Sequence, residues 1–258
     1  MQLTVFAPRA EATRLVDGLA VMRTGPAITR TLVAECRLSM GVRIAGAAHR
    51  WQGDGWQTLP LYTMTGVHCT SRTIRTDPQS TLVLAHLHPA AARLLGVDPT
   101  KLVERSIDLT TFWPHTELDQ LARHLRRLPD DAERASCLED FVVQRLTLHE
   151  RGPDPSIVEA VSRIRATRGD VRISEIAAVL GLSVDTLERR FNACVGVSPK
   201  RFARAVRLRA AVLAYSPEVT LTEVAMEAGY YDQSHFVREI RLATGQPPNR
   251  LLGSQNWC

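Results

Sequence analysis

The stretch AMEAGYYDQSHFVREI, residues 225–240, decides the fold of the last third of this 258-residue chain. Much of its pattern already occurs upstream, with Ala177 standing 48 residues before Ala225. Further residues recur at a spacing of 49, namely Leu187 and Phe236, Arg189 and Arg238, Gly196 and Gly245, and Pro199 and Pro248. An internal repeat indicates a repeated structural unit, here with one extra residue in the turn of the second copy.

Each copy predicts a helix, a tight turn and a second helix. In the first copy, Ser174 is the expected N-cap of the leading helix. Ile176, Val179 and Leu180 are expected to form its buried face. Gly181 follows, at a position that needs a left-handed backbone, which glycine adopts without strain.

The second helix of each copy is expected to start at a polar cap and to bury two apolar residues four positions apart. The expected caps are Ser183 and Asp232, and the expected buried pairs are Leu187 with Phe191 and Phe236 with Ile240. The leading helix of the second copy is expected to turn Val224, Ala225 and Ala228 inward and to end at Gly229. This arrangement is typical of the helix-turn-helix unit.

The repeat and its surroundings resemble the AraC/XylS family of bacterial transcription regulators over about residues 156–251. The resemblance depends on residues 207–211 (RLRAA), 225–240 and 244–251 (TGQPPNRL). It implies a DNA-binding domain over 156–258, with helix-turn-helix units at about 174–195 and 221–243. The chain departs from the family at Ile240, usually Phe, and near Asn249 and Arg250, usually an aromatic followed by Arg. Both departures concern packing.

Positions opposite the buried residues, taken at roughly 100° per residue, are candidates for contacts with DNA bases. Gln233 is added because base contacts concentrate at the start of a recognition helix. The expected base-reading residues are Asp185, Glu188, Arg189, Asn192, Gln233, Ser234 and Arg238. Arginine can pair with guanine, glutamine with adenine, and glutamate with cytosine. The resemblance places all of these except Asn192 at the family's base-facing positions.

An ordinary solvated helix face is the alternative, and it is strongest for Asp185 and Glu188 because phosphates repel carboxylates. Those two residues would then orient a neighbouring arginine or exclude wrong bases.

A long helix is expected between the units, at about 199–215. Ser198 is its expected cap, Pro199 suits its first turn, and Ser216 and Pro217 end it. Its expected buried stripe consists of Phe202, Val206 and Leu213. Such a helix, roughly 24 Å long, can hold two recognition helices about one DNA turn apart, roughly 34 Å. The expected phosphate contacts are Lys200, Arg204, Arg207 and Arg241, with a solvated face as the alternative for each.

The composition argues against several classes of protein but does not indicate a binding partner. The net charge is +5 and the pI about 9.2, divided almost evenly along the chain, so charge alone does not indicate DNA binding. The five cysteines contain no CxxC pair, which argues against a zinc finger and fits a reducing compartment. No apolar run is long enough for a membrane span, and the N-terminus lacks the pattern of a signal peptide. We therefore expect a cytoplasmic protein without membrane contact, and we expect no cofactor.

Residues 1–150 are expected to form an effector-sensing or dimerisation domain, with residues 151–155 as a linker. Gly53-Asp54-Gly55 between Trp51 and Trp56 predicts a β-hairpin. Residues 81–85 predict a strand, and residues 89–96 predict a short helix that turns Leu94 and Leu95 inward. The chain is thus expected to be α+β, with a small β-rich domain that includes helices, followed by an all-α domain.

Residues 116–149 predict helices with two apolar stripes. The stripes consist of Leu118, Leu121, Leu125 and Leu128, and of Leu138, Phe141, Val142 and Leu146. Packing in the core and dimerisation are both possible uses, of which core packing is the commoner. Residues 81–97 are loosely similar to an N-terminal domain found in some AraC-type regulators, which implies a sensor or dimerisation domain without naming a ligand.

His86 and His88 alternate along the expected strand, and His68 lies on another possible strand. Three such rings could bind zinc or copper. Histidines at the surface or with satisfied hydrogen bonds are the favoured interpretation, because the spacing matches no recognised metal signature and a proline break beside His86 and His88 often brings exposure.

The sequence therefore predicts a transcription regulator that binds specific double-stranded DNA and responds to an effector as an activator. The resemblance implies contact with RNA polymerase, and the N-terminal domain is expected to bind a small-molecule effector, a second copy of the chain, or both. Repression and a purely architectural role are the alternatives. An enzyme fused to the DNA reader is not expected, because the chain has neither a zinc-binding cysteine cluster nor a GxSxG motif.

Overall fold

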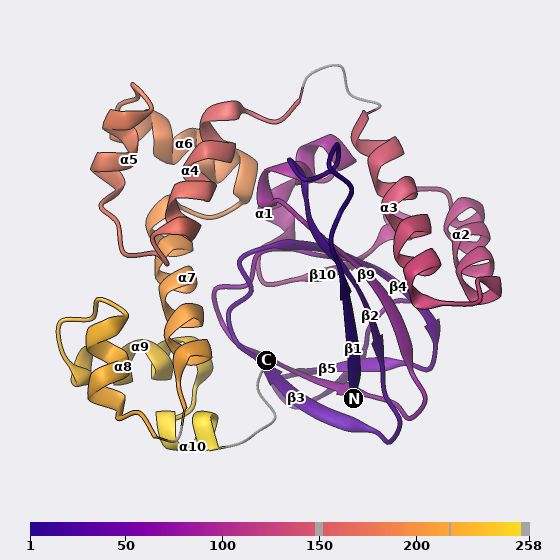
Figure 1. Ribbon diagram of the computed structural model, residues 1–258, viewed down its shortest axis with the longest axis horizontal. Coiled ribbons are helices and arrows are strands. Elements are labelled where there is room, and N and C mark those ends of the chain that lie inside the picture. The colour runs from indigo at the N-terminus through magenta and orange to yellow at the C-terminus, as the bar shows by residue number, and fades with distance from the viewer. Residues whose placement is uncertain (148–151, 217, 254–258) are drawn as a thin grey trace.

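The computed structural model describes residues 1–147, 152–216 and 218–253. Figure 1 shows two parts side by side, a β-sheet domain followed by helices and then an all-helical region. The predicted α+β class is therefore confirmed. Of the residues and ranges given above, Pro217 and positions 148–151 and 254–258 lie outside the described residues.

In the described residues, ten strands form two antiparallel sheets. One has six strands in the order β1-β2-β9-β4-β7-β10, and the other has four in the order β3-β8-β5-β6. The strands are β1 (Gln2–Phe6), β2 (Val16–Arg23), β3 (Ile28–Leu32), β4 (Leu38–Ala45), β5 (Ala48–Gln52), β6 (Gly55–Thr58), β7 (Tyr62–Thr65), β8 (Arg72–Thr76), β9 (Thr81–Leu87) and β10 (Ser106–Asp108). The hairpin β5–β6 turns at Gly53 and pairs Trp51 with Trp56, as the sequence predicted.

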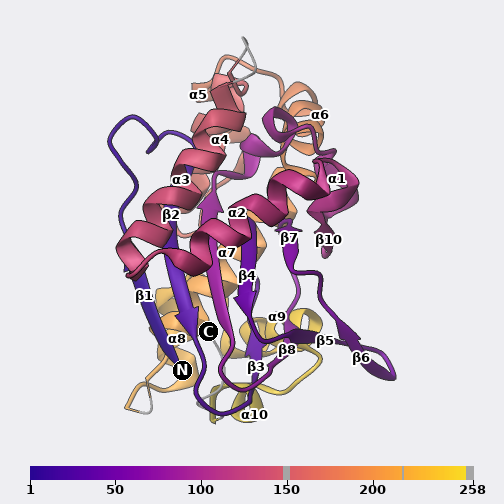
Figure 2. The same ribbon diagram turned by 90° about the vertical axis from the view of Figure 1, so that its right-hand side faces the viewer.

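The helices of the N-terminal part are η1 (Pro89–Leu95), α1 (Pro99–Leu102), η2 (Leu109–Thr111), α2 (His115–Arg127) and α3 (Asp131–Thr147). Of these, α2 and α3 cover one face of the six-stranded sheet. Figure 2 shows α2 and α3 lying across strands β2, β9 and β4. Of the leucines in the two predicted stripes, Leu118, Leu125 and Leu138 are fully buried there, so the stripes are used for core packing.

Successive side chains of β9 point to opposite faces of the sheet. Val83, Ala85 and Leu87 are fully buried beneath the helices. Leu82, Leu84 and His86 face the other way, into the space between the two sheets. The strand and the short helix after it were both predicted, and Leu94 and Leu95 are buried as expected.

Seven helices are described in the C-terminal part. They are α4 (Pro155–Ala166), α5 (Ile173–Val179), α6 (Val184–Val195), α7 (Pro199–Ala214), α8 (Leu221–Glu227), α9 (Gln233–Thr244) and α10 (Pro248–Gly253). In Figure 1, α7 runs from the group α4–α6 to the group α8–α10. We call α5 with α6 the first helix-turn-helix unit, α8 with α9 the second, and α6 and α9 the recognition helices.

Three expectations about buried faces and caps were wrong. Helix α5 begins at Ile173 behind Arg172, so Ser174 is not its cap. Val179 is 60% exposed, because Ile176 and Ala177 define the buried face and Val179, two residues after Ala177, lies outside its edge. Leu213 is 54% exposed, because the small side chains Ala205 and Ala211 complete the buried stripe of α7 in its place.

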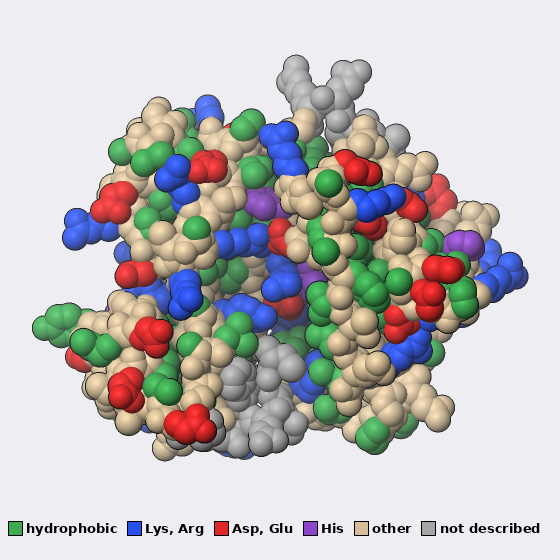
Figure 3. Space-filling model, viewed as in Figure 1, with side chains coloured by type: hydrophobic (Ala, Val, Ile, Leu, Met, Phe, Trp, Pro, Cys, Tyr) green, Lys and Arg blue, Asp and Glu red, His purple; other side chains and the backbone are tan. Residues whose placement is uncertain are grey.

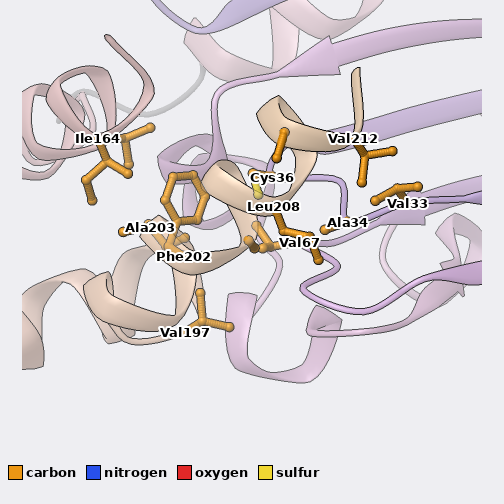
Figure 4. Close-up of a cluster of buried hydrophobic side chains, with 14 of the residues drawn as sticks. Val33, Ala34, Cys36, Val67, Ile164, Val197, Phe202, Ala203, Leu208 and Val212 are labelled. Atoms are coloured by element: carbon orange, nitrogen blue, oxygen red, sulfur yellow. The ribbon is translucent and has the colours of Figure 1, made fainter. Parts of the chain in front are cut away.

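One apolar cluster joins the two parts of the chain. Figure 4 shows Val33, Ala34 and Val67 from the β domain beside Phe202 and Leu208 of α7. All five side chains are almost fully buried. The helical region is thus packed directly on the β domain. No helix in the described part of the chain is long and apolar enough to cross a membrane.

Candidate DNA-binding surface and adjoining cavity

The two helix-turn-helix units share the same local chemistry. Gly181 and Gly229 carry the turns at φ +65° and +73°, in the left-handed region. Ser183 accepts a hydrogen bond from the Thr186 amide at 3.2 Å at the start of α6. Asp232 accepts one from the His235 amide at 2.7 Å at the start of α9. The two caps predicted for the second helices are therefore confirmed.

The buried faces of the recognition helices are as predicted. Leu187, Phe191, Phe236 and Ile240 are fully buried. The candidate base-reading residues lie on the exposed side of their helices, and they are Asp185, Glu188, Arg189, Asn192, Gln233, Ser234 and Arg238. Among the residues that the structure describes, no ion pair engages Arg189 or Arg238, whereas the Gln233 amide oxygen accepts a hydrogen bond from Thr222 at 2.8 Å.

Two of the four candidate phosphate contacts already have partners within the protein. Arg204 of α7 forms a two-point ion pair with Glu239 of α9, at 2.6 and 3.1 Å. Arg207 donates to the Gly169 carbonyl at 2.8 Å and to the Gly229 carbonyl at 3.4 Å. These contacts fix α7 against the loop before the first helix-turn-helix unit and against the second unit. Lys200 and Arg241 are exposed.

A cavity of about 340 Å³ lies between the two sheets of the β domain. Its apolar walls include Met22, Ile74, Leu82 and Leu84. Its charged lining consists of five arginines and one glutamate, namely Arg30, Arg37, Arg43, Arg72, Arg209 and Glu35. The sequence did not single out these arginines, which are far apart along the chain. The one available signal is an arginine inside an apolar strand, such as Arg43 in the run MGVRIA.

The pKa values of two charged groups in the cavity, Glu35 and Arg43, lie far from their ordinary values. Burial alone would raise the pKa of Glu35, but Arg72 and Arg37 outweigh burial and hold that pKa at about 2. Glu35 and Arg72 form an ion pair. Burial lowers the pKa of Arg43 to about 10, with Asp77 opposing this shift and Arg30 reinforcing it. The cavity thus holds an excess of buried positive charge.

The cavity reaches the DNA-binding region through Arg209 of α7. Arg209 lines both the cavity and a groove of about 470 Å³ between the two parts, and it donates to the Ala34 carbonyl at 3.2 Å. Arg37, Arg165 and Arg168 also line the groove. Figure 3 shows a hollow between the two parts in which basic side chains gather. An anion in the cavity would therefore lie close to a helix that positions both helix-turn-helix units.

The three histidines weighed as metal ligands have separate hydrogen-bond partners. His68 bonds to the Gly66 carbonyl at 2.9 Å, His86 to the Ser39 hydroxyl at 3.0 Å, and His88 accepts from the Ala90 amide at 3.2 Å. Burial lowers their pKa values to about 3, 4 and 4 respectively. No metal-binding group of three or more His, Cys, Asp or Glu side chains occurs in the described ranges. Each ring has one hydrogen bond and none is at the surface, but the buried Nε2 atoms of His68 and His88 have no hydrogen-bond partner.

Polar contacts also join the β domain to both recognition helices. The Ser71 amide donates to the Ala243 carbonyl of α9 at 2.7 Å. Arg93 donates to the Ala193 carbonyl of α6 at 2.8 Å. Glu104 forms an ion pair of 2.9 Å with Arg201 of α7. The β domain is therefore placed to influence how the recognition helices are held.

Comparisons with known proteins agree with this architecture. Residues 176–254 match a family model described as a helix-turn-helix domain. The chain is 28% identical over 88 residues to the HTH-type transcriptional regulator ExsA of Pseudomonas aeruginosa. The aligned segment covers 34% of this chain and 32% of ExsA. It is 25% identical over 253 residues to the xylose operon regulatory protein of Escherichia coli. This alignment covers 85% of this chain and 60% of that protein. The chain thus spans less than two thirds of each of these relatives.

Among solved structures, apo ToxT from Vibrio cholerae has a similar fold, with a TM-score of 0.50 and 11% identity over 92% of this chain and 96% of that one. At this identity the likeness concerns the fold alone. The relatives matched by sequence are named as regulatory proteins, and the matched family model covers the repeated helix-turn-helix region. The helix-turn-helix region of this chain is therefore similar to that of AraC/XylS-type transcription regulators.

Proposed function

We propose that this chain is an effector-responsive activator that reads two adjacent major-groove segments. The observation that carries the proposal is the position of α7. Arg209 of this helix lines the cavity of the β domain, and Arg207, two residues earlier, bonds to the loop before the first helix-turn-helix unit and to the turn of the second. A ligand that shifts Arg209 would act on the helix that spaces the two recognition helices.

Base reading is assigned to the exposed faces of α6 and α9. Arg189 and Arg238 occupy equivalent positions, and each would donate two hydrogen bonds to a guanine. Gln233 would bond to adenine after leaving Thr222. Asn192 and Ser234 add smaller polar contacts, whereas Asp185 and Glu188 would orient the arginines or accept from cytosine.

Phosphate contact is assigned to Lys200, Arg204, Arg207 and Arg241. Lys200 and Arg241 are exposed, so they are the ready contacts. Arg204 would have to exchange Glu239 for phosphate, while Arg207 would contact DNA from the side chain that also bonds to the Gly169 and Gly229 carbonyls. RNA polymerase is proposed as a partner from the resemblance to the family's activators, and a second copy of the chain is proposed as a further partner through the β domain.

The test is a footprint of the full chain on DNA fragments selected from genomic DNA by binding. Two protected segments about one DNA turn apart, roughly 34 Å, are expected on one side of the duplex. Transcription from the same fragments by added RNA polymerase should rise when the chain binds. A footprint limited to one short segment would contradict the two-segment assignment, and a fall in transcription would make the chain a repressor.

A further inference from the structure

The groove between the β domain and the helical region is built on one extended segment of the chain. The Glu35 amide donates to the His68 carbonyl at 2.7 Å, and the Glu35 carbonyl accepts from the His68 amide at 3.0 Å. Backbone groups of successive residues alternate between the two edges of an extended segment. The carbonyls of Ala34 and Cys36 therefore lie on the edge away from His68, about 6.6 Å apart.

These two carbonyls hold two guanidinium groups beside each other. Arg209 of α7 donates to the Ala34 carbonyl at 3.2 Å, and Arg165 of α4 donates to the Cys36 carbonyl at 2.9 Å. Arg37 follows Cys36 directly and lines the same groove. Three arginines from three separate parts of the sequence thus meet at one short segment. Neither carbonyl supplies a negative charge to balance them.

The groove has fewer acids than arginines. One acid lines it, Asp17, against four arginines, namely Arg37, Arg165, Arg168 and Arg209. Asp17 is engaged by Arg165 at 2.9 and 3.2 Å. Glu35 favours the charge of Arg37 from the neighbouring cavity, but it is itself held in an ion pair by Arg72. Among the residues that the structure describes, no ion pair engages Arg168 or Arg209. The groove therefore favours an anion from outside the chain.

The arginines of the groove also act on one another. Burial lowers the pKa of Arg37, and the charges of Arg209 and Arg165 lower it further, while Glu35 and Asp17 oppose the shift. Charges influence each other in this way only at short range, so the three guanidinium groups lie close together. An anion among them would relieve their mutual repulsion.

The wall of the groove on α7 is apolar on both sides of Arg209. Val206, Ala210 and Leu213 line it at helical spacing, and we call these three residues the α7 stripe. The stripe extends about 10 Å along the helix axis. Leu213 is 54% exposed although it is apolar, so the end of the stripe is uncovered in the free chain. The groove volume, about 470 Å³, falls within the range of small-molecule sites.

We propose that the groove binds an organic phosphate monoester, whose phosphate is held by Arg37, Arg165 and Arg209 and whose apolar part lies on the α7 stripe. A phosphate monoester carries close to two negative charges at neutral pH and three acceptor oxygens. Guanidinium groups bond to such oxygens in pairs, so one phosphate can engage three arginines. A carboxylate has one charge and two oxygens, which suit one arginine. The assignment does not depend on the cavity being an effector site or on the DNA-reading proposal.

The experiment measures ligand affinity of the full chain by isothermal titration calorimetry in a buffer without phosphate. The probes are phenyl phosphate, benzoate, glucose 6-phosphate and inorganic phosphate. Phenyl phosphate is expected to bind about tenfold more tightly than benzoate, because benzoate keeps the ring and loses one charge. It should also bind about tenfold more tightly than glucose 6-phosphate or inorganic phosphate, which offer the α7 stripe no apolar part.

Three variants of the groove change its charge in opposite directions. Arg209→Met should weaken phenyl phosphate about tenfold, because it removes a charged donor. Arg168→Met should weaken it about twofold to threefold, because Arg168 is exposed and its charge is screened. Asp17→Asn should strengthen binding about threefold, since it frees Arg165 from a competing carboxylate. Arginines that only tied the two parts together would not give this gain.

Arg163→Met provides the matched control. Arg163 lies on α4 two residues before Arg165, pairs with Glu159 at 2.7 Å and is not part of the groove lining. This variant should bind phenyl phosphate as the unchanged protein does. If Arg209→Met does not fold, Asp17→Asn and Arg168→Met decide the question, because both replace exposed residues.

Equal affinity for phenyl phosphate and benzoate, or for phenyl phosphate and glucose 6-phosphate, would overturn the assignment. An affinity for phenyl phosphate that falls in Asp17→Asn, or that none of the three groove variants changes, would overturn it as well. These outcomes are separate from the DNA-binding proposal, because the calorimetry contains no DNA. A chain that binds the ester in this way but shows no two-segment footprint would keep the site and contradict the DNA-reading proposal.

Discussion

Arg189 and Arg238 occupy equivalent positions on the two recognition helices, and both are exposed. We expect Arg189→Ala to cost about 1–3 kcal/mol of binding free energy at one base pair of the site. The fold should be unaffected, because the arginine side chain supports no described ion pair. Measuring the affinity for a set of single-base variants of the selected site checks this.

Arg163→Ala serves as the control, because Arg163 pairs with Glu159 on the surface of α4 and is not a proposed DNA contact. If Arg189→Ala weakened binding equally at every sequence, Arg189 would be a phosphate contact.

The buried histidines give stability a defined pH dependence. Burial holds the pKa of His86 at about 4, against 6.5 for an ordinary histidine. The unfolded chain therefore takes up a proton that the folded chain refuses, so the unfolding free energy falls as pH drops from about 6.5 to about 4 and levels off below. The difference is worth roughly 3 kcal/mol for this residue.

Urea unfolding at several pH values should show a shallower fall for His86→Gln than for the unchanged protein. The exposed His124 is the control, and His124→Gln should leave the slope as it was. Identical slopes for all three proteins would mean that other groups control the acid sensitivity.

At the scale of elements, the turn before α5 depends on Gly169. Its φ of +79° lies in the left-handed region, and an added Cβ would meet the Ala203 carbonyl and come within 2.7 Å of the Arg207 amide. Gly169→Ala is therefore expected to destabilise the protein by about 2–5 kcal/mol, from backbone strain and overpacking together. DNA affinity should fall as well, because α7 and the first helix-turn-helix unit would separate. Thermal unfolding and footprinting measure the two effects.

Gly181 offers a matched comparison. It has a similar φ of +65°, but an added Cβ would meet nothing within 4 Å. Gly181→Ala should therefore cost only the strain, about 1–2 kcal/mol. Equal losses in the two variants would show that the contact with α7 contributes little.

Local chemistry made the helix-turn-helix units predictable, because caps, glycine turns and apolar pairs act over a few residues. Ser183, Asp232, Leu187 and Phe236 all behave as expected. Val179 was misassigned because apolar character was taken for burial, whereas the residue lies just outside the face that Ile176 and Ala177 bury. The base-reading and phosphate roles are still predictions, since the free protein shows where side chains lie and not what they bind.

The cavity was beyond the reach of sequence reasoning for a different physical reason. Its walls form where β9 pairs with β2 and β4, strands that are far apart along the chain. Arginines on such strands read as surface residues until the second sheet covers them. The position of Arg43 is thus a property of tertiary packing, and no local pattern encodes it.

At the scale of the whole molecule, Glu104 joins the two parts. Its carboxylate accepts from the Cys69 amide at 2.9 Å and the Thr70 hydroxyl at 2.7 Å, and it pairs with Arg201 of α7. We expect Glu104→Gln to loosen this corner, because a neutral amide cannot replace an ion pair and two accepted hydrogen bonds. Amide hydrogen exchange should rise at Ser71, which bonds to the Ala243 carbonyl of α9.

Glu117→Gln is the control, since Glu117 pairs with Arg145 inside the β domain. It should leave exchange at Ser71 unchanged. Unaltered exchange at Ser71 in Glu104→Gln would show that the apolar cluster alone holds the parts together.

The apolar cluster between the β domain and α7 determines how truncated fragments of this protein would behave. Val33, Ala34 and Val67 of the β domain are buried in the same apolar cluster as Phe202 and Leu208 of α7. Neither part alone therefore has a fully polar surface. If the two parts were expressed separately, each would expose an apolar surface that the other part covers in the full chain. Aggregation of such fragments would then result from the loss of this interface. Point mutations are therefore better suited than truncations to separate the roles of the two parts.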